Sequence, residues 1–180
     1  MSHFYSMQAW LLAPTYVLVG EPIDSRSGKL TALDDGSVVA LFTSTESARE
    51  FTETYYAEED ISRFQYGMVN ALGFAGWLEA LGEVGVKTVV FDPVATSVGR
   101  WTHQSETVTV GYYRHFAAEL GSGLENLVAE AYTDAGHEFG NPPNVSRMSA
   151  WCESRVDGVI EDARARAAEW VAKADPQRRQ

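Results

Sequence analysis

The segment from Asp92 to His103 (DPVATSVGRWTH) holds the most varied set of reactive side chains in this sequence. It supplies a carboxylate, a guanidinium, a large aromatic surface and a titratable imidazole, from Asp92, Arg100, Trp101 and His103. The segment follows an apolar run that predicts a buried strand, and open α/β sheets bind ligands beyond the carboxyl ends of their strands. We therefore predict a ligand-binding site here, with a hydrolytic site as a variant. The competing interpretation is an ordinary connecting loop.

The histidines and the cysteine, which often form metal or catalytic sites in proteins, do not form a recognisable site in this sequence. The histidines are scattered and lack the clustered spacing of a zinc site: His3, His103, His115 and His137. We accordingly predict no metal site, no cofactor and no catalytic residue, and we favour a protein that is not an enzyme. Cys152 lies in an apolar helical stripe, which is typical of a buried, unreactive thiol, whereas a catalytic thiolate needs a histidine and a positive setting.

Gly121-Ser122-Gly123 precedes a helical pattern, and helix N-termini can bind anions through their free N–H groups. No phosphate-loop or dinucleotide fingerprint surrounds these residues. We therefore interpret them as a plain turn between two helices.

Composition and charge narrow the classes of partner. The chain has 180 residues, is 45% hydrophobic and carries a net charge of −11, which repels nucleic-acid phosphates. The densest acidic run, Glu58 to Asp60, is either a solvated loop or a docking patch for a basic partner. The apolar stretch from Ala9 to Gly20 is too short to span a bilayer and does not resemble a signal peptide. We expect a cytoplasmic protein without nucleic-acid or membrane partners.

The first half of the chain predicts strands and one helix. Pro14 to Glu21 is β-branched and aromatic, which indicates a buried strand. Asp-Gly at 35–36 separates two apolar runs and predicts a hairpin, because glycine supplies the positive φ of a tight turn. A helix is then expected to about Tyr56, with Ser44 or Thr45 as its N-cap.

The following segments alternate between strand and helix signals. Strands are predicted at 62–68, 86–91 and 106–110, and helices at 69–81, 112–120 and 124–131. These elements indicate an α+β fold (α/β-like) with a mixed sheet of about four to five strands covered by helices. We assign residues 1–131 to this domain.

The last part of the chain predicts a long C-terminal helix. Glycines and prolines mark residues 132–145 as a linker, residues 146–174 are helical throughout, and 175–180 form a basic tail. The helix is amphipathic, so its apolar stripe needs a cover. Either the helix packs on its own domain, or it binds a partner protein or a second copy of the chain. The predicted interface residues are Trp151, Val159, Ile160 and Trp170.

The block Val38-Val39-Ala40-Leu41-Phe42-Thr43-Ser44 follows a hairpin and leads into a helix with Glu46, Ala48 and Phe51. Together with the later Val89-Val90-Phe91-Asp92-Pro93, this pattern resembles the N-terminal domain of SseB-like proteins. The resemblance covers roughly Thr15 to Val94. It implies a small bacterial α/β module that serves as an interaction or accessory domain, and it carries over no catalytic residues. Where a typical relative has Asn before the proline, this chain has Asp92.

These observations lead to one preferred function and two alternatives. We favour a non-enzymatic protein-binding module with the C-terminal helix as its docking or dimerisation element. The first alternative is a small-ligand-binding or hydrolytic domain with its site at 92–103. The second is an acidic, immunity-type inhibitor that masks a basic toxin, which the net charge favours.

Overall fold

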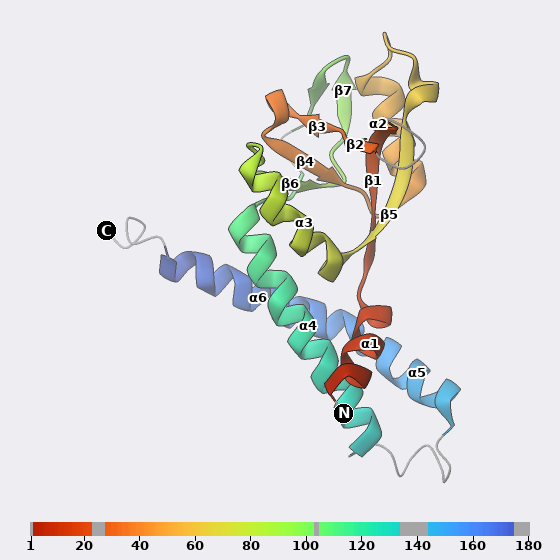
Figure 1. Ribbon diagram of the computed structural model, residues 1–180, viewed down its shortest axis with the longest axis vertical. Helices are drawn as coiled ribbons and strands as arrows, with labels where there is room; N and C mark the ends of the chain where they lie inside the picture. Colours follow the sequence, from red (N-terminus) through yellow and green to blue (C-terminus); the bar gives the residue numbers. More distant parts are fainter. Residues whose placement is uncertain (1, 23–27, 103–104, 134–143, 175–180) are drawn as a thin grey trace. The chain divides into compact units, whose positions relative to one another are not determined.

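The computed structural model describes residues 2–22, 28–102, 105–133 and 144–174, which form two compact units (Figure 1). Residues 15–111 make the sheet unit, and residues 1–14 together with 112–180 make the helical unit. From the sequence, residues 1–131 are expected to form a single domain. The ends of that range belong instead to the helical unit, because α1 (Ser2–Leu12) packs against α4 (Val110–Thr133). Ser6 Oγ donates to Glu125 Oε1 across these helices at 2.5 Å.

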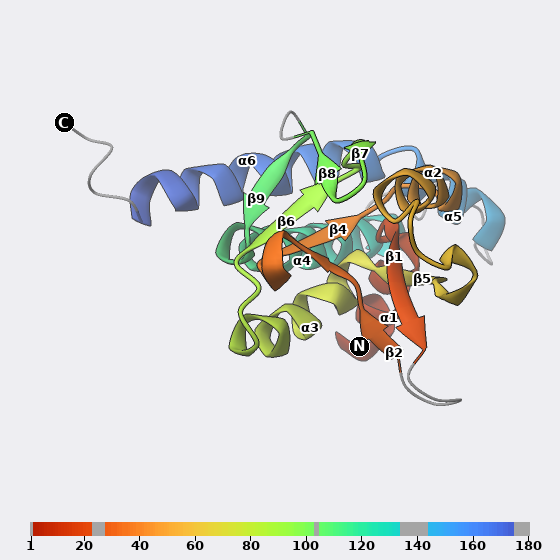
Figure 2. The ribbon, with the colours of Figure 1, turned by 90° about the horizontal axis from the view of Figure 1, so that it is seen from above.

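The sheet unit confirms the expected α+β class, with its described strands divided among three small sheets. The first has the order β2-β1-β5 and is antiparallel: β2 (Gly28–Leu30), β1 (Thr15–Pro22), β5 (Gln65–Asn70). The second has the order β3-β4-β6-β9: β3 (Ala32–Leu33), β4 (Val38–Leu41), β6 (Thr88–Phe91), β9 (Thr107–Thr109). Figure 2 shows β4, β6 and β9 side by side, with β4 and β6 parallel. The third sheet is the pair β7 (Ala95–Ser97) and β8 (Arg100–Trp101).

Two local predictions in the sheet unit are confirmed. Leu33 pairs with Val38 across a short 3-10 turn, η1 (Asp34–Gly36), in which both aspartates and Gly36 have positive φ. The helix α2 (Thr45–Tyr55) begins after Ser44, whose side chain accepts the Ser47 N–H at 3.0 Å. Ser44 is therefore the N-cap, and it satisfies one of the free N–H groups of the first turn.

The main core of the sheet unit lies between α2 and the strands β1, β4 and β6. Val17 bonds to Phe42 through both backbone groups, which joins the first sheet to the second. A chain of ring contacts runs outward from this core: Phe42, Phe51, Tyr55, Tyr56, Phe64. The other face of β1 is covered by α3 (Ala71–Glu83), where Phe74 and Leu78 are fully buried. Aromatic burial of this kind supplies much of the stability of a small core.

The helical unit differs from the sequence prediction at its longest helix. A turn was expected at 121–123, but α4 continues through these residues to Thr133. Glycines disfavour a helix by roughly 1 kcal/mol each. Gly123 nevertheless suits this position, because a Cβ there would lie 2.6 Å from Cγ1 of Val159 on α6 (Val156–Ala174). The close approach of the two helices explains why the glycine lies inside a helix.

The predicted single helix 146–174 is two helices, α5 (Val145–Glu153) and α6. The break is at Ser154 and Arg155. Ser154 Oγ donates to the Trp151 carbonyl at 2.8 Å, and the Arg155 N–H donates to the Cys152 carbonyl at 2.9 Å. A serine hydroxyl that binds the preceding turn competes with the helical hydrogen-bond pattern, so the helix ends there.

The predicted linker, 132–145, is described only in part, and the predicted basic tail, 175–180, is not described. Residues 132–133 belong to the end of α4 and Asn144 is the N-cap of α5, whereas 134–143 and the tail 175–180 lie outside the described residues. Within the part of the chain that the structure describes, no helix combines the length and the apolar character needed to cross a bilayer.

Candidate functional site

The sheet unit contains a cleft of about 440 Å³, here called the acidic cleft. It is assembled from the end of β1, the β2–β3 segment, the η1 turn and the segment between α2 and β5. Its lining residues are Glu21, Leu30, Thr31, Ala32, Asp35, Gly36, Tyr56, Glu59 and Arg63. The positive φ of Asp35 and Gly36 turns the η1 backbone sharply between β3 and β4, and both residues line the cleft.

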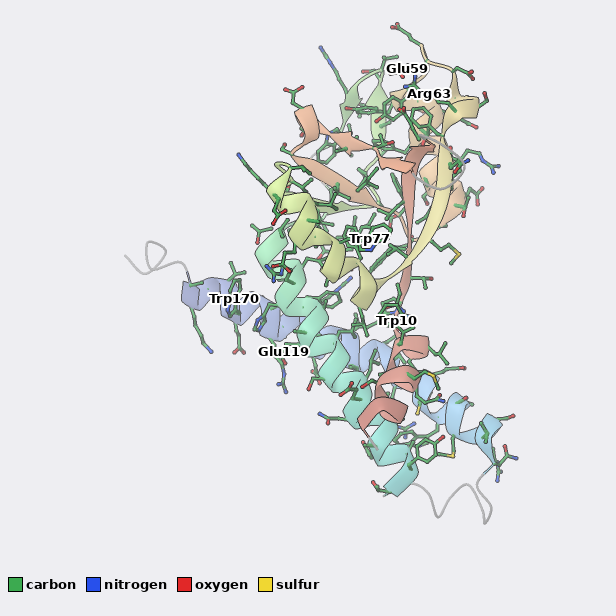
Figure 3. All side chains as sticks on the ribbon, in the orientation of Figure 1. Trp10, Glu59, Arg63, Trp77, Glu119 and Trp170 are labelled. Atoms are coloured by element: carbon green, nitrogen blue, oxygen red, sulfur yellow. The ribbon has the colours of Figure 1, made fainter. Side chains whose placement is uncertain are left out.

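Charge in the acidic cleft is predominantly negative. Its lining includes the carboxylates of Glu21, Asp35 and Glu59 against the single guanidinium of Arg63. Arg63 lies 3.2 Å from Glu21 and also forms an ion pair with Glu59, and Figure 3 shows Glu59 and Arg63 next to each other. Among the described lining residues one cation faces three carboxylates, and this excess of negative charge favours a cationic group.

The wall of the acidic cleft is aromatic and polar. Burial raises the pKa of the Tyr56 phenol, and the neighbouring Tyr55, Glu59 and Glu21 raise it further while Arg63 opposes them. Tyr56 therefore stays protonated at neutral pH and offers an O–H group. Thr31 Oγ1 is buried and has no hydrogen-bond partner among the described residues. A hydroxyl of this kind is one that a bound group can satisfy.

A second hollow of about 280 Å³ lies between α3 and the first sheet, and we call it the apolar groove. It is lined by Leu18, Val19, Gly20, Glu21, Leu30, Gln65, Gly67, Met68, Val69 and Trp77. Trp77, labelled on α3 in Figure 3, is 58% exposed, and Met68 is 74% exposed. Large apolar side chains exposed together are typical of surfaces that bind another molecule. Glu21 and Leu30 line both hollows, so the two adjoin at one end of the β1–β2 pair.

No family model, curated protein or solved structure matches this chain. The resemblance to the SseB-like N-terminal domain thus rests on the residues quoted above, and it stays a prediction.

Of the predicted ligand residues, Asp92 lines a hollow of about 270 Å³ beside α2 together with Pro93, Val94 and Ala95, and Arg100 and Trp101 are not among the residues that line it. Asp92 has a positive φ, and its carboxylate accepts the Thr43 N–H at 2.9 Å and the Thr43 hydroxyl at 3.0 Å. It thereby ties the end of β6 to the end of β4. Trp101 is only 7% exposed, and its indole N–H donates to Asp34 Oδ1 at 3.1 Å. Arg100 is exposed on β8, and His103 lies outside the described residues.

The predicted interface residues on the C-terminal helices make contacts within the helical unit. Val159 packs against Gly123, and Trp170 stacks on His115 with ring centroids 5.2 Å apart. Trp151 is covered by the Arg155 guanidinium at 4.0 Å, and Ile160 is half-buried. The residues of α6 that are fully buried are instead Ala163 and Ala167. The role of these residues in assembly stays a prediction.

The helical unit has smaller hollows and one notable thiol. A groove of about 260 Å³ is lined by residues of α1, α4 and α5, and Cys152 is one of them. Cys152 is buried, as expected, and burial is the main cause that raises the pKa of its thiol. Raising the pKa suppresses the thiolate, which is the reactive form. Among the described residues, no group of three His, Cys, Asp or Glu side chains is placed to hold a metal ion.

Only parts of the acidic cleft carry a signal in the sequence. The Asp-Gly turn predicts a hairpin, and the run Glu58 to Asp60 is either a solvated loop or a docking patch. Asp35 and Glu59 from these two segments line one cleft. Glu21, Tyr56 and Arg63 gave no signal of their own, because nothing in their spacing shows that β1 pairs with β5. That pairing aligns Gly20 with Gln65 and so brings the two segments together.

Proposed function

We propose that this chain is a non-enzymatic protein-binding module that recognises a basic partner through its sheet unit. The observation that carries the proposal is the adjoining pair of hollows, one acidic and one apolar, that share Glu21 and Leu30. A surface that combines exposed apolar side chains with an excess of carboxylates suits a partner that offers apolar and basic side chains together.

The net charge of −11 supports the same partner class. Long-range attraction between an acidic surface and a basic partner accelerates their encounter and suppresses binding of acidic competitors. An acidic inhibitor of a basic toxin is one member of this class. The remaining proposal, a ligand-binding or hydrolytic segment at 92–103, draws no support from the described contacts of Asp92 and Trp101.

The proposal is tested with a labelled octapeptide of alternating lysine and valine, titrated against the full chain by fluorescence anisotropy. We expect saturable binding that weakens as salt is raised, because screening reduces the attraction between exposed charges. A matched octapeptide of alternating glutamate and valine is expected not to bind.

The double variant Glu21→Gln/Glu59→Gln removes two carboxylates from the acidic cleft and is expected to weaken binding by about tenfold, or ~1.4 kcal/mol. Glu130→Gln/Glu161→Gln makes the same change of net charge on exposed helical positions and serves as the control. An equal loss in both double variants would show unspecific attraction and reject the proposed site. If spermidine competes as strongly as the peptide does, the site would be assigned to a small amine and not to a protein partner.

A further inference from the structure

The apolar groove adjoins the acidic cleft at Glu21 and Leu30, which line both hollows. We infer that the basic partner anchors itself with one aromatic side chain in the apolar groove, and that a lysine or arginine next to this anchor lies near Glu21. This inference rests on the proposed function and specifies the contact that the partner makes.

The floor of the apolar groove is poor in side chains. Leu18 of β1 lies opposite Gly67 of β5, so the two positions belong to the same face of the first sheet. Gly20 follows Leu18 on this face and also lines the groove. A Cβ built on Gly67 would meet no atom within 4 Å. The neighbouring side chains therefore do not fill this space, and a ring from a partner can lie on the bare strand backbone.

The sides of the apolar groove offer an indole ring and a thioether. Phe74 and Leu78 of α3 are fully buried, whereas Trp77 lines the groove and remains largely exposed (Figure 3). Met68 of β5 lines the groove as well and is also largely exposed. Contacts between two rings, and between sulfur and a ring, are favourable beyond the apolar area that they bury. Trp77 and Met68 together therefore favour an aromatic occupant over an aliphatic one.

The size of the apolar groove suits one large side chain. Its volume is about 280 Å³. Pockets that enclose a drug-sized ligand usually measure roughly 300–1,000 Å³. Binding energy in protein interfaces is concentrated on a few aromatic or arginine side chains that fill pockets of this kind. An aromatic anchor is thus the form in which a protein partner can use this groove.

Glu21 determines the charge of the residue beside the anchor. It is the only charged residue among those that line the apolar groove. Arg63 lies 3.2 Å from the Glu21 carboxylate but is shared with Glu59, so one guanidinium serves two carboxylates. A basic residue next to the anchor supplies the missing positive charge. A second copy of the chain fits less well, because each copy carries a net charge of −11.

The experiment uses the full chain and the labelled lysine–valine octapeptide with its fourth residue, a valine, replaced by phenylalanine or by cyclohexylalanine. We expect the phenylalanine peptide to bind about tenfold more tightly than the unmodified peptide. Cyclohexylalanine has a similar shape but no aromatic ring, and we expect it to bind at least about threefold more weakly than phenylalanine.

Protein variants test the same contact from the other side. Gly67→Val fills the groove from its floor, and Trp77→Ala removes its indole, so each is expected to abolish the advantage of the phenylalanine peptide over the unmodified one. Gly82→Ala and Trp10→Ala are the matched controls, because neither residue lines either hollow. Both controls are expected to keep the advantage. Thermal unfolding checks that every variant keeps a cooperative transition.

The basic residue beside the anchor is tested in the phenylalanine peptide. Glutamine replaces either the two lysines that flank the phenylalanine or the other two lysines, so both changes remove the same charge. We expect the flanking pair to cost about tenfold in affinity and the other pair about threefold or less. Glu21→Gln is expected to reduce the difference between the two peptides. Equal losses would reject a basic residue at this place.

The outcomes separate the anchor from the proposed function. If the phenylalanine peptide binds no more tightly than the unmodified one, or keeps its advantage in Gly67→Val and Trp77→Ala, the anchor is rejected. The proposed function then stands if Glu21→Gln/Glu59→Gln still weakens the unmodified peptide. Equal binding of the cyclohexylalanine and phenylalanine peptides would reject an aromatic occupant. Absence of binding by all of these peptides would reject both proposals, and a dimer that Gly67→Val dissociates would assign the groove to a second copy.

Discussion

Single side chains in the acidic cleft have more than one role. Arg63 neutralises part of the charge of Glu21 and Glu59, and its guanidinium lies 4.9 Å from the ring centroid of Phe64. The cleft therefore keeps its carboxylates close together without leaving all of them unpaired. Exposed ion pairs of this kind add little to stability, so we expect their main effect on partner choice.

Tyr56 connects this cleft to the stability of the sheet unit. Its pKa is raised in the folded chain, chiefly by burial, so the folded state holds the phenolic proton more tightly than the unfolded state does. The resulting stability is fully present below the unfolded-state pKa of about 10 and is lost as pH rises above it.

We predict that Tyr56→Phe makes the unfolding free energy less sensitive to alkali. Between pH 9 and pH 11 the unfolding free energy is expected to fall in both proteins, and to fall by about 1 kcal/mol less in the variant than in the parent. This difference is discounted for solvent screening, because Tyr56 is partly solvent-accessible. Urea unfolding at both pH values measures the difference, and Tyr132→Phe at an exposed position is the control. An unchanged pH dependence in Tyr56→Phe would contradict the assignment.

Among the elements, the packing of α6 on α4 depends on one glycine. Gly123 lets Val159 approach closely, and two polar contacts join the same helices. The Tyr112 hydroxyl donates to the Arg164 carbonyl at 3.3 Å, and Arg166 lies 3.3 Å from Glu119. Figure 3 labels Glu119 on α4 and Trp170 on α6. The C-terminal helix thus uses part of its apolar stripe within the helical unit.

We predict that Gly123→Ala destabilises the chain by about 1–3 kcal/mol, because the new methyl group would overlap Val159. Val159→Ala in the same chain is expected to restore most of that loss, which a double-mutant cycle of unfolding free energies measures. Gly76→Ala, a helical position with open space, is the control and is expected to add about 0.5–1 kcal/mol. Additive effects of the two changes at 123 and 159 would show that the helices do not meet there.

At the scale of the whole molecule, the two units differ in how the chain builds them. The sheet unit is one continuous segment, 15–111, and its main core cluster runs from Val17 to Trp101. The helical unit needs two separate segments, because Ala9 of α1 is buried while α4, α5 and α6 come from the other end of the chain.

We predict that residues 15–111 fold on their own, whereas 112–180 without α1 do not form a well-packed unit. A segment that contains its whole core retains the contacts that stabilise it. Dispersed amide resonances and a cooperative thermal transition of the 15–111 segment would support this prediction. Residues 112–180 are expected to melt over a broader range. A 15–111 segment without a cooperative transition would contradict the division into units.

More of the fold than of the candidate site could be predicted from the sequence. The strands β1, β4, β5, β6 and β9, the helix after Ser44 and the hairpin at Asp34 to Gly36 were predicted because their signals lie within a few residues of the chain. The strands β7 and β8 were not predicted. The candidate site was found only in fragments. Its residues come from four separate segments. Asp92 and Trp101, whose side chains suggested a ligand site, have hydrogen-bond partners in Thr43 and Asp34.

The sequence by itself determined the local elements, the α+β class and the acidic character, because backbone propensity, turn chemistry and net charge depend on residue types and near neighbours. Only the tertiary structure decided that α4 passes through Gly123, that the C-terminal helix breaks at Ser154, and that β1 aligns with β5. These features depend on contacts between residues distant in sequence. The energy of such contacts outweighs local preference, and no short pattern in the chain encodes which segments will meet.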